Sequence, residues 1–199
     1  MLVNLGINLL GVLTFLFIFW KRLKEDYAHE IIFKSALYIT TGIAVGSVIA
    51  FRFTPPWFLW LEFLGAGCGI VISLLILKTR FYETFESLVI AALPWIGLVF
   101  LNDSVGRSSL SSFLGFLTTL AFILLYYYLD SHYKKFSWYK SGKIGFSGLV
   151  TLGIIFLTRA VVAVSESVVL SFVNKYEVAF SVTAAFLCFL AVFNLARKI

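Results

Sequence analysis

The chain has 199 residues, of which 61% are hydrophobic and 18% aromatic, and its mean hydropathy is +0.99. A soluble domain is only roughly half apolar, so the composition excludes a soluble enzyme and indicates an integral membrane protein. The length leaves room for about six or seven spans of about 20 residues each and little else. The formal net charge of +6 does not indicate a nucleic acid partner, because the sequence has no basic groove pattern with interleaved aromatic residues.

Apolar runs separated by charged or Pro/Gly-rich breaks predict an all-α polytopic membrane protein with about seven transmembrane helices, in a single transmembrane domain over residues 1–199. The fourth run is short and contains Pro94, which predicts a kink or only partial insertion. The segment Ser165–Tyr176 mixes apolar and polar residues and is predicted as an interfacial helix in preference to a loop. The predicted spans are Val3–Trp20, Ile31–Phe53, Trp57–Leu77, Ser87–Leu101, Ser112–Leu129, Ile144–Val164 and Val178–Leu195.

The Lys and Arg residues are distributed unevenly over the predicted connections, and this bias sets the orientation of a membrane protein. With the N-terminus outside, the outer connections carry Arg52, Arg107 and Lys175. The inner connections and the C-terminal tail carry many more, so the sequence predicts an N-out, C-in topology. The inner residues are Lys21, Arg22, Lys24, Lys78, Arg80, Lys134, Lys135, Lys140, Lys143, Arg197 and Lys198.

Polar residues that interrupt the apolar pattern gather near the outer ends of the predicted spans. A charge at mid-membrane costs about 2.5–3.5 kcal/mol on insertion scales, so such residues usually pair with each other, snorkel or line a polar cavity. Guanidinium groups bind phosphate bidentately, and the bilayer supplies phosphate locally. We therefore expect a site for a lipid headgroup; the alternative is that each long side chain snorkels to the interface. The expected headgroup ligands are Arg52, Asn102, Arg107 and Arg159.

Glu62 lies near the outer start of the third predicted span, just before a dense run of glycines. Such a run suggests backbone that approaches a ligand or a break in the helix beside a polar cavity. The alternative is close packing against the second span, where Gly42 and Gly46 form a GxxxG pair. The expected cavity-lining glycines are Gly65, Gly67 and Gly69.

The order of these segments resembles the prolipoprotein diacylglyceryl transferase family of bacteria. GIAVGSVIAFRF resembles the family's glycine-rich second span, LEFLGAGCGI resembles its histidine-glycine-glycine segment, and YKSGKIGFSGLVTLGIIF resembles its sixth span. Seven spans with the N-terminus outside is also that family's topology. The motif residues differ: Val48, Leu64 and Phe156 stand where the family has arginine, histidine and arginine, and Arg159 follows one helical turn after Phe156.

The resemblance implies a divergent transferase in the bacterial plasma (inner) membrane that moves diacylglyceryl from phosphatidylglycerol to the cysteine of a lipoprotein precursor, without a cofactor or metal. The candidate base for the thiol proton is Glu62, although we expect Glu62 to pair structurally with an arginine. Convergence of Arg107 and Arg159 on one cavity would favour this activity. The alternatives are a non-catalytic lipid-binding relative and a small-solute transporter.

Overall fold

The computed structural model describes residues 2–139, 141–165 and 176–197, and the described part is all-α, with no strand. In lipid the backbone N–H and C=O groups must be satisfied within a segment, so the apolar runs form helices. Seven of these helices are long and apolar enough to cross a membrane. The helices are α1 (Leu2–Leu23), α2 (His29–Phe53), α3 (Phe58–Leu77), α4 (Phe81–Arg107), α5 (Leu110–His132), α6 (Phe146–Ser165) and α7 (Tyr176–Ala196), with short 3₁₀ turns η1 (Pro55–Trp57) and η2 (Tyr133–Lys135).

The fourth helix is longer than its predicted span, Ser87–Leu101. It covers 27 residues with Pro94 inside it, and the stretch Phe81–Gly106 is long enough to cross a membrane. The prediction that the fourth segment is short is therefore wrong, because polar residues at both ends of α4 belong to the helix. The predicted interfacial helix over Ser165–Tyr176 falls on residues 166–175, which lie outside the described residues.

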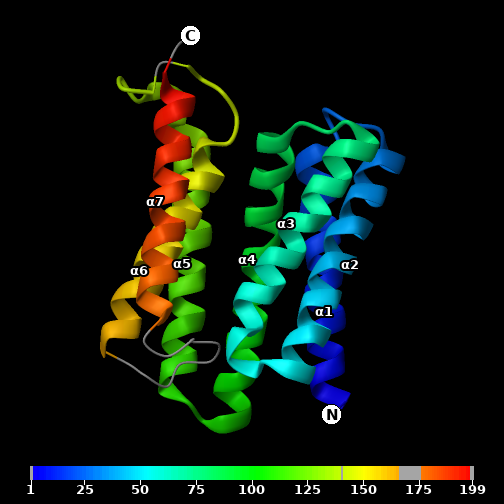
Figure 1. The fold of residues 1–199 in the computed structure, drawn as a ribbon, viewed down its shortest axis with the longest axis vertical. Helices are drawn as coiled ribbons and strands as arrows, with labels where there is room; N and C mark the ends of the chain where they lie inside the picture. The colour runs from blue at the N-terminus through cyan, green and yellow to red at the C-terminus, as the bar shows by residue number, and fades with distance from the viewer. Residues whose placement is uncertain (1, 140, 166–175, 198–199) are drawn as a thin grey trace.

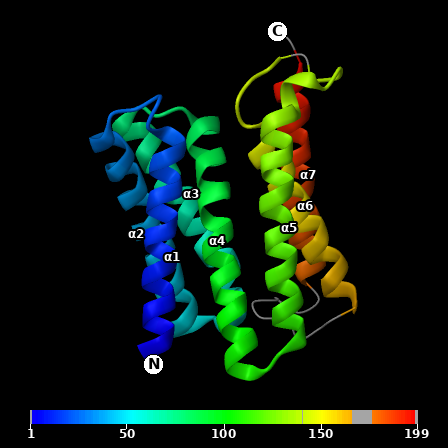
Figure 2. The ribbon, with the colours of Figure 1, turned by 180° about the vertical axis from the view of Figure 1, so that it is seen from behind.

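The helices form two groups, α1 to α4 and α5 to α7, that run the length of the molecule side by side (Figures 1 and 2). At one end of the molecule, α1, α3, α5 and α7 finish and α2, α4 and α6 begin (Figure 1). The C-terminus lies at the same end. We call this the basic end, because Lys21, Lys78 and Lys134 lie there; the N-terminus lies at the opposite end.

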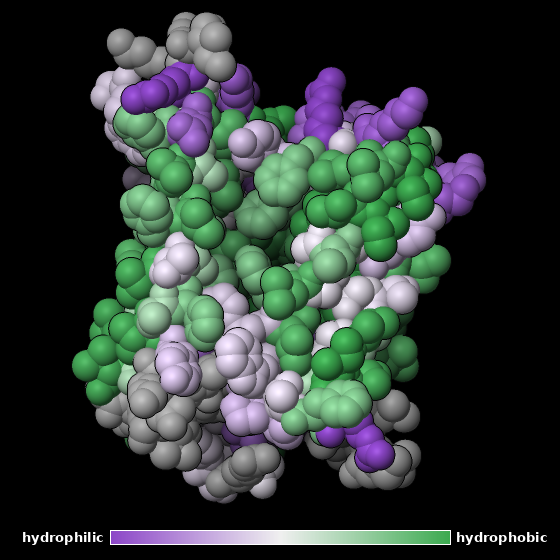
Figure 3. All heavy atoms as spheres, viewed as in Figure 1, coloured by the Kyte–Doolittle hydropathy of each residue, from purple (hydrophilic) through white to green (hydrophobic). Residues whose placement is uncertain are grey.

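The most hydrophilic residues gather toward the two ends of the surface seen in Figure 3, and most of the surface between them is apolar. Large apolar side chains in the middle of the helices are exposed, for example Leu13 at 55% and Leu124 at 70%. A soluble protein rarely exposes so much contiguous apolar surface, so this belt is the part that contacts lipid chains.

Two of the three glycines in α3 bring its backbone against α2. A Cβ added at Gly65 would overlap the carbonyl group of Gly42, and one added at Gly69 would overlap the backbone of Ile39, whereas one added at Gly67 would meet nothing within 4 Å. The helix α3 continues through all three positions, so the expected helix break does not occur. Close helix packing thus accounts for Gly65 and Gly69 without a cavity.

This packing predicts that Gly65→Ala lowers the free energy of unfolding by about 1–3 kcal/mol, because the two backbones must separate to admit the methyl group. The matched control Gly67→Ala, in the same helix, should leave it unchanged or raise it by up to about 1 kcal/mol, because the methyl group meets open space and alanine favours a helix over glycine. Unfolding by a denaturing detergent in mixed micelles measures both. Equal effects of the two substitutions would show that Gly65 does not set the α2–α3 distance.

Candidate functional site

Glu86 is a buried carboxylate on α4 near the basic end, with only 2% of its surface exposed. Its Oε2 accepts a hydrogen bond from the backbone N–H of Gly145 at 2.6 Å, and its Oε1 accepts one from the hydroxyl of Tyr126 at 3.3 Å. The Nη2 of Arg22 lies 3.5 Å from Oε1. Glu86 therefore connects α4 with α1, with α5 and with the start of α6.

The start of α6 depends on this carboxylate and on two glycines. Gly145 has a φ of +112°, which favours glycine, and a Cβ added at Gly148 would lie 3.0 Å from the Cα of Glu86. The first N–H groups of a helix lack intrahelical partners and carry partial positive charge, so a carboxylate beside them stabilises the helix. Glu86 thus holds the start of α6 in direct contact with α4.

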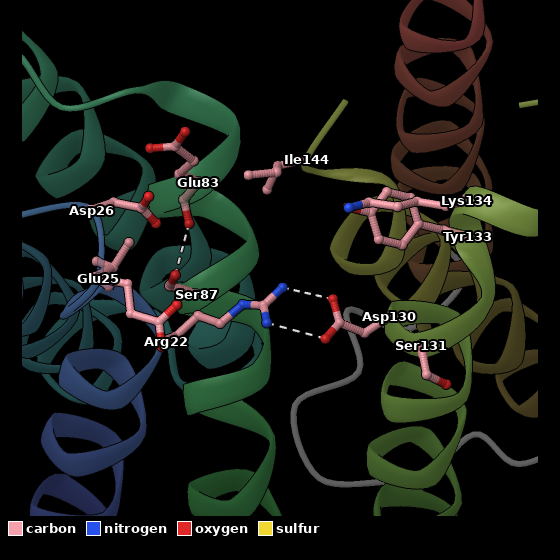
Figure 4. A pocket seen from close by; sticks show the side chains of 11 residues that line it. Arg22, Glu25, Asp26, Glu83, Ser87, Asp130, Ser131, Tyr133, Lys134 and Ile144 are labelled. Carbon is pink, nitrogen blue, oxygen red and sulfur yellow. Dashed lines mark hydrogen bonds and ion pairs between the residues drawn. The ribbon is translucent and has the colours of Figure 1, made fainter. Parts of the chain in front are cut away.

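Arg22 on α1 forms a two-pronged pair with Asp130 on α5 (Figure 4). Its Nη2 lies 2.6 Å from Oδ1 and its Nη1 lies 3.1 Å from Oδ2. Bidentate arginine–carboxylate pairs are among the stronger hydrogen-bonded contacts in proteins. Because α1 and α5 belong to different groups, this pair fastens the two groups at the basic end.

A cavity of about 490 Å³ lies beside this pair (Figure 4). Glu25, Asp26 and Glu83 line it from the first group and Lys134 lines it from the second, so the lining carries both signs of charge. The hydroxyl of Tyr27, just outside it, donates to Glu83 at 2.5 Å. Burial and this hydrogen bond raise the pKa of Tyr27, which therefore keeps its proton at neutral pH.

A second polar network lies toward the opposite end and centres on Glu177 in the first turn of α7. Glu177 is fully buried, and its Oε1 accepts hydrogen bonds from the Nε and Nη2 of Arg159 at 3.1 and 2.8 Å and from the hydroxyl of Ser181 at 2.9 Å. Its Oε2 accepts one from the indole N–H of Trp60 at 3.0 Å. The network joins α3 of the first group to α6 and α7 of the second.

The Arg159 side chain is only 14% exposed, and its guanidinium is oriented by Glu177. The Trp60 ring stacks on Phe156, with ring centroids 5.5 Å apart, and so fixes the indole donor. Arg159, an expected headgroup ligand, thus lies in a rigid network of a cation, a carboxylate and an indole. Chemically, such a network can orient a guanidinium toward an anion near it.

Glu62 has a different partner from the one predicted. Its Oε1 accepts a hydrogen bond from the hydroxyl of Ser47 on α2, and within the described part of the chain no arginine pairs with it. Residues two apart on an α-helix project about 200° from each other. Glu62 therefore faces α2 while Trp60 faces Glu177 on α7, and the prediction of an arginine partner is wrong because of this rotation of α3.

The other expected headgroup ligands come from two helices at the same end. Arg52 lies in the last turn of α2 with an exposed side chain, and Asn102 is half-buried near the end of α4. Arg107 is the last residue of α4, and its side chain lies outside the described part of the structure. Among the described residues, no hydrogen bond or ion pair joins Arg52 to the network of Arg159.

Glu86, Asp130 and Glu177 were not identified as site residues from the sequence, and Arg22 was counted only as a basic loop residue. Glu177 immediately precedes the predicted span Val178–Leu195, and Glu86 immediately precedes Ser87–Leu101. A carboxylate directly before an apolar run was the only feature of the sequence that pointed to these residues. Which partner such a carboxylate meets depends on the rotation of the helix about its axis, and the hydropathy pattern does not give that rotation.

Comparison of the chain with protein-family models, with curated proteins and with solved structures gives no match. Function is therefore inferred from the arrangement of the described side chains and from the resemblance in segment order.

Glu177→Gln should lower the free energy of unfolding by about 3–5 kcal/mol, because it removes the negative charge that Glu177 places against the buried guanidinium of Arg159. The matched control is Glu30→Gln, which removes the partner of Lys34 in an exposed pair and should produce no measurable change. Replacing both partners, as in Arg159→Met with Glu177→Gln, should recover much of the loss. Detergent unfolding measures all four proteins. Equal losses at Glu30 and Glu177 would contradict the assignment of a buried, mutually dependent pair.

Proposed function

We propose that the protein is a divergent phosphatidylglycerol:prolipoprotein diacylglyceryl transferase. It acts near the end opposite the basic end, where it takes diacylglyceryl from phosphatidylglycerol and joins it to the cysteine of a lipoprotein precursor. The proposal places that end at the outer face of a bacterial plasma membrane. The helix order, the uneven distribution of lysine and arginine, and the resemblance in segment order support it.

The observation that carries the proposal is the buried Arg159 network. A buried arginine within a membrane-spanning helix is expensive and is usually kept for a functional reason. Arg159 lies about one turn from the position that the resemblance assigns to a family arginine, Phe156, and Glu177 orients it. In the proposed site its guanidinium contacts the lipid phosphate, which leaves with its glycerol as the new carbon–sulfur bond forms.

The transfer also requires removal of the thiol proton, since the thiolate is the nucleophile. Glu62 faces Ser47 and α2, on the side of α3 away from the Arg159 network, so it is not placed to serve as a base beside Arg159. This observation favours the second candidate, a relative that binds phosphatidylglycerol at the same place without transferring its diacylglyceryl group.

The experiment is transfer of labelled diacylglyceryl from phosphatidylglycerol to a lipoprotein-precursor peptide by the purified full chain in nanodiscs, with a Cys→Ser peptide as the blank. Arg159→Ala should lower the transfer rate by about 100-fold, the usual effect of losing a donor to developing negative charge. Arg159→Lys should recover only part of it, because lysine lacks the planar fork. Arg107→Ala tests the other expected ligand, and the exposed Lys34→Gln serves as the control.

Phosphatidylglycerol binding is measured on the same preparations. Binding that depends on Arg159 without transfer to the peptide would establish the second candidate and reject the first. A folded preparation in which Arg159→Ala changes neither binding nor transfer would contradict both.

A further inference from the structure

The connection between α5 and α6, which we call the Tyr133–Gly145 segment, is strongly basic and aromatic. Its sequence, YKKFSWYKSGKIG, contains Lys134, Lys135, Lys140 and Lys143 and has no Asp or Glu. The side chains of Lys134, Lys135 and Lys143 are exposed. The segment therefore presents a concentrated positive charge at the basic end.

A buried aromatic cluster holds this segment in a defined shape. The hydroxyl of Tyr139, a residue only 1% exposed, donates to the backbone carbonyl of Lys143 at 2.7 Å. Its ring lies 4.5 Å from that of Phe146, at the start of α6, and the ring of Phe136 lies 5.7 Å from Phe146, measured between centroids. These contacts fix the described residues around Lys134, Lys135 and Lys143, so these three lysines can bind a partner at a low entropic cost.

Aromatic side chains are exposed beside these lysines. Trp138 contacts Phe146, with centroids 5.4 Å apart, yet remains 56% exposed, and Tyr127 and Tyr128 near the same end of α5 are 55% and 57% exposed. Exposed Trp and Tyr side chains at the end of a membrane-spanning helix are typical of the headgroup region of a bilayer. The segment therefore lies at the level of lipid headgroups.

The basic end of the first helix group has a different charge balance. Its exposed cations Lys21, Lys24 and Lys78 are accompanied by the exposed carboxylates of Glu25 and Asp26, which follow Lys24 directly. In the second group, Arg197 lies just after the end of α7, and Leu195, two residues before it, packs in the same apolar cluster as Tyr139. The Tyr133–Gly145 segment is thus a run of lysines with no acidic residue of its own; Lys134 borders the cavity that Glu25 and Asp26 line, whereas Lys135 and Lys143 do not line it.

We propose that the Tyr133–Gly145 segment binds the headgroups of anionic phospholipids in the leaflet that borders the basic end. The lysines supply the charge that an anionic headgroup complements, and Trp138 anchors the segment at the interface. This surface lies at the end of the molecule opposite the proposed transferase site and does not depend on that function.

The test compares two variants that each remove three positive charges. The full chain is reconstituted in phosphatidylcholine bilayers, and the motionally restricted fraction of spin-labelled phosphatidylserine relative to spin-labelled phosphatidylcholine is measured by electron spin resonance. Phosphatidylserine is used because it is not the donor of the proposed transfer. The segment variant is Lys134→Gln, Lys135→Gln, Lys143→Gln, and the matched control is Lys21→Gln, Lys24→Gln, Lys78→Gln.

A surface lysine contributes about 1 kcal/mol to the attraction of anionic lipid, so the segment variant should lose at least about threefold in preference for phosphatidylserine. The control should lose less than about 1.5-fold on the same scale. Restricted phosphatidylcholine reports the perimeter of the folded bundle in each sample, and the Lys→Arg version of the segment variant should keep the full preference. Equal losses in the segment variant and the control, or an unchanged preference in the segment variant, would overturn the proposal.

Discussion

A buried charge in an apolar environment has to find an opposite charge and hydrogen-bond donors, and the arrangement of the two helix groups follows from this constraint. Glu86 and Glu177 are the two most deeply buried carboxylates in the described chain, at 2% and 0% exposure. Each has partners in both groups: Glu86 contacts Arg22 and Tyr126, and Glu177 contacts Arg159 and Trp60. The apolar faces alone would pack equally well against lipid chains, so these two networks specify how the groups meet.

The two networks have different surroundings, and this difference separates the roles proposed for the two ends. At the basic end, Glu86 supports the start of α6, and the Arg22–Asp130 pair borders a cavity of mixed charge. Toward the opposite end, Glu177 pairs with Arg159 and accepts a hydrogen bond from the indole of Trp60, whose ring stacks on Phe156. The first network is mainly structural, whereas the second presents an oriented guanidinium.

The sequence was sufficient for the fold class and for the number of spans, because hydrophobic runs of this length have few alternatives in a membrane. It failed at the start of α4, because the predicted span began at Ser87 and left out Glu83 and Glu86, which are both buried in the helix. It also paired Glu62 with an arginine. Helix rotation decides such partners: it turns Glu62 toward Ser47 and brings together Arg159 and Glu177, which are 18 residues apart. Hydropathy carries no information on that rotation.

We infer from the distribution of lysine and arginine that the two ends of the molecule face opposite sides of a membrane, with the basic end inside and the Arg159 network near the outer face. Single cysteines at Ser137, at the basic end, and at Ser111, at the start of α5, test it in a chain whose Cys68 and Cys188 are replaced by alanine. A membrane-impermeant maleimide added to intact cells should label Ser111→Cys, and should label Ser137→Cys only after permeabilisation. Labelling of Ser137→Cys alone in intact cells would contradict the account.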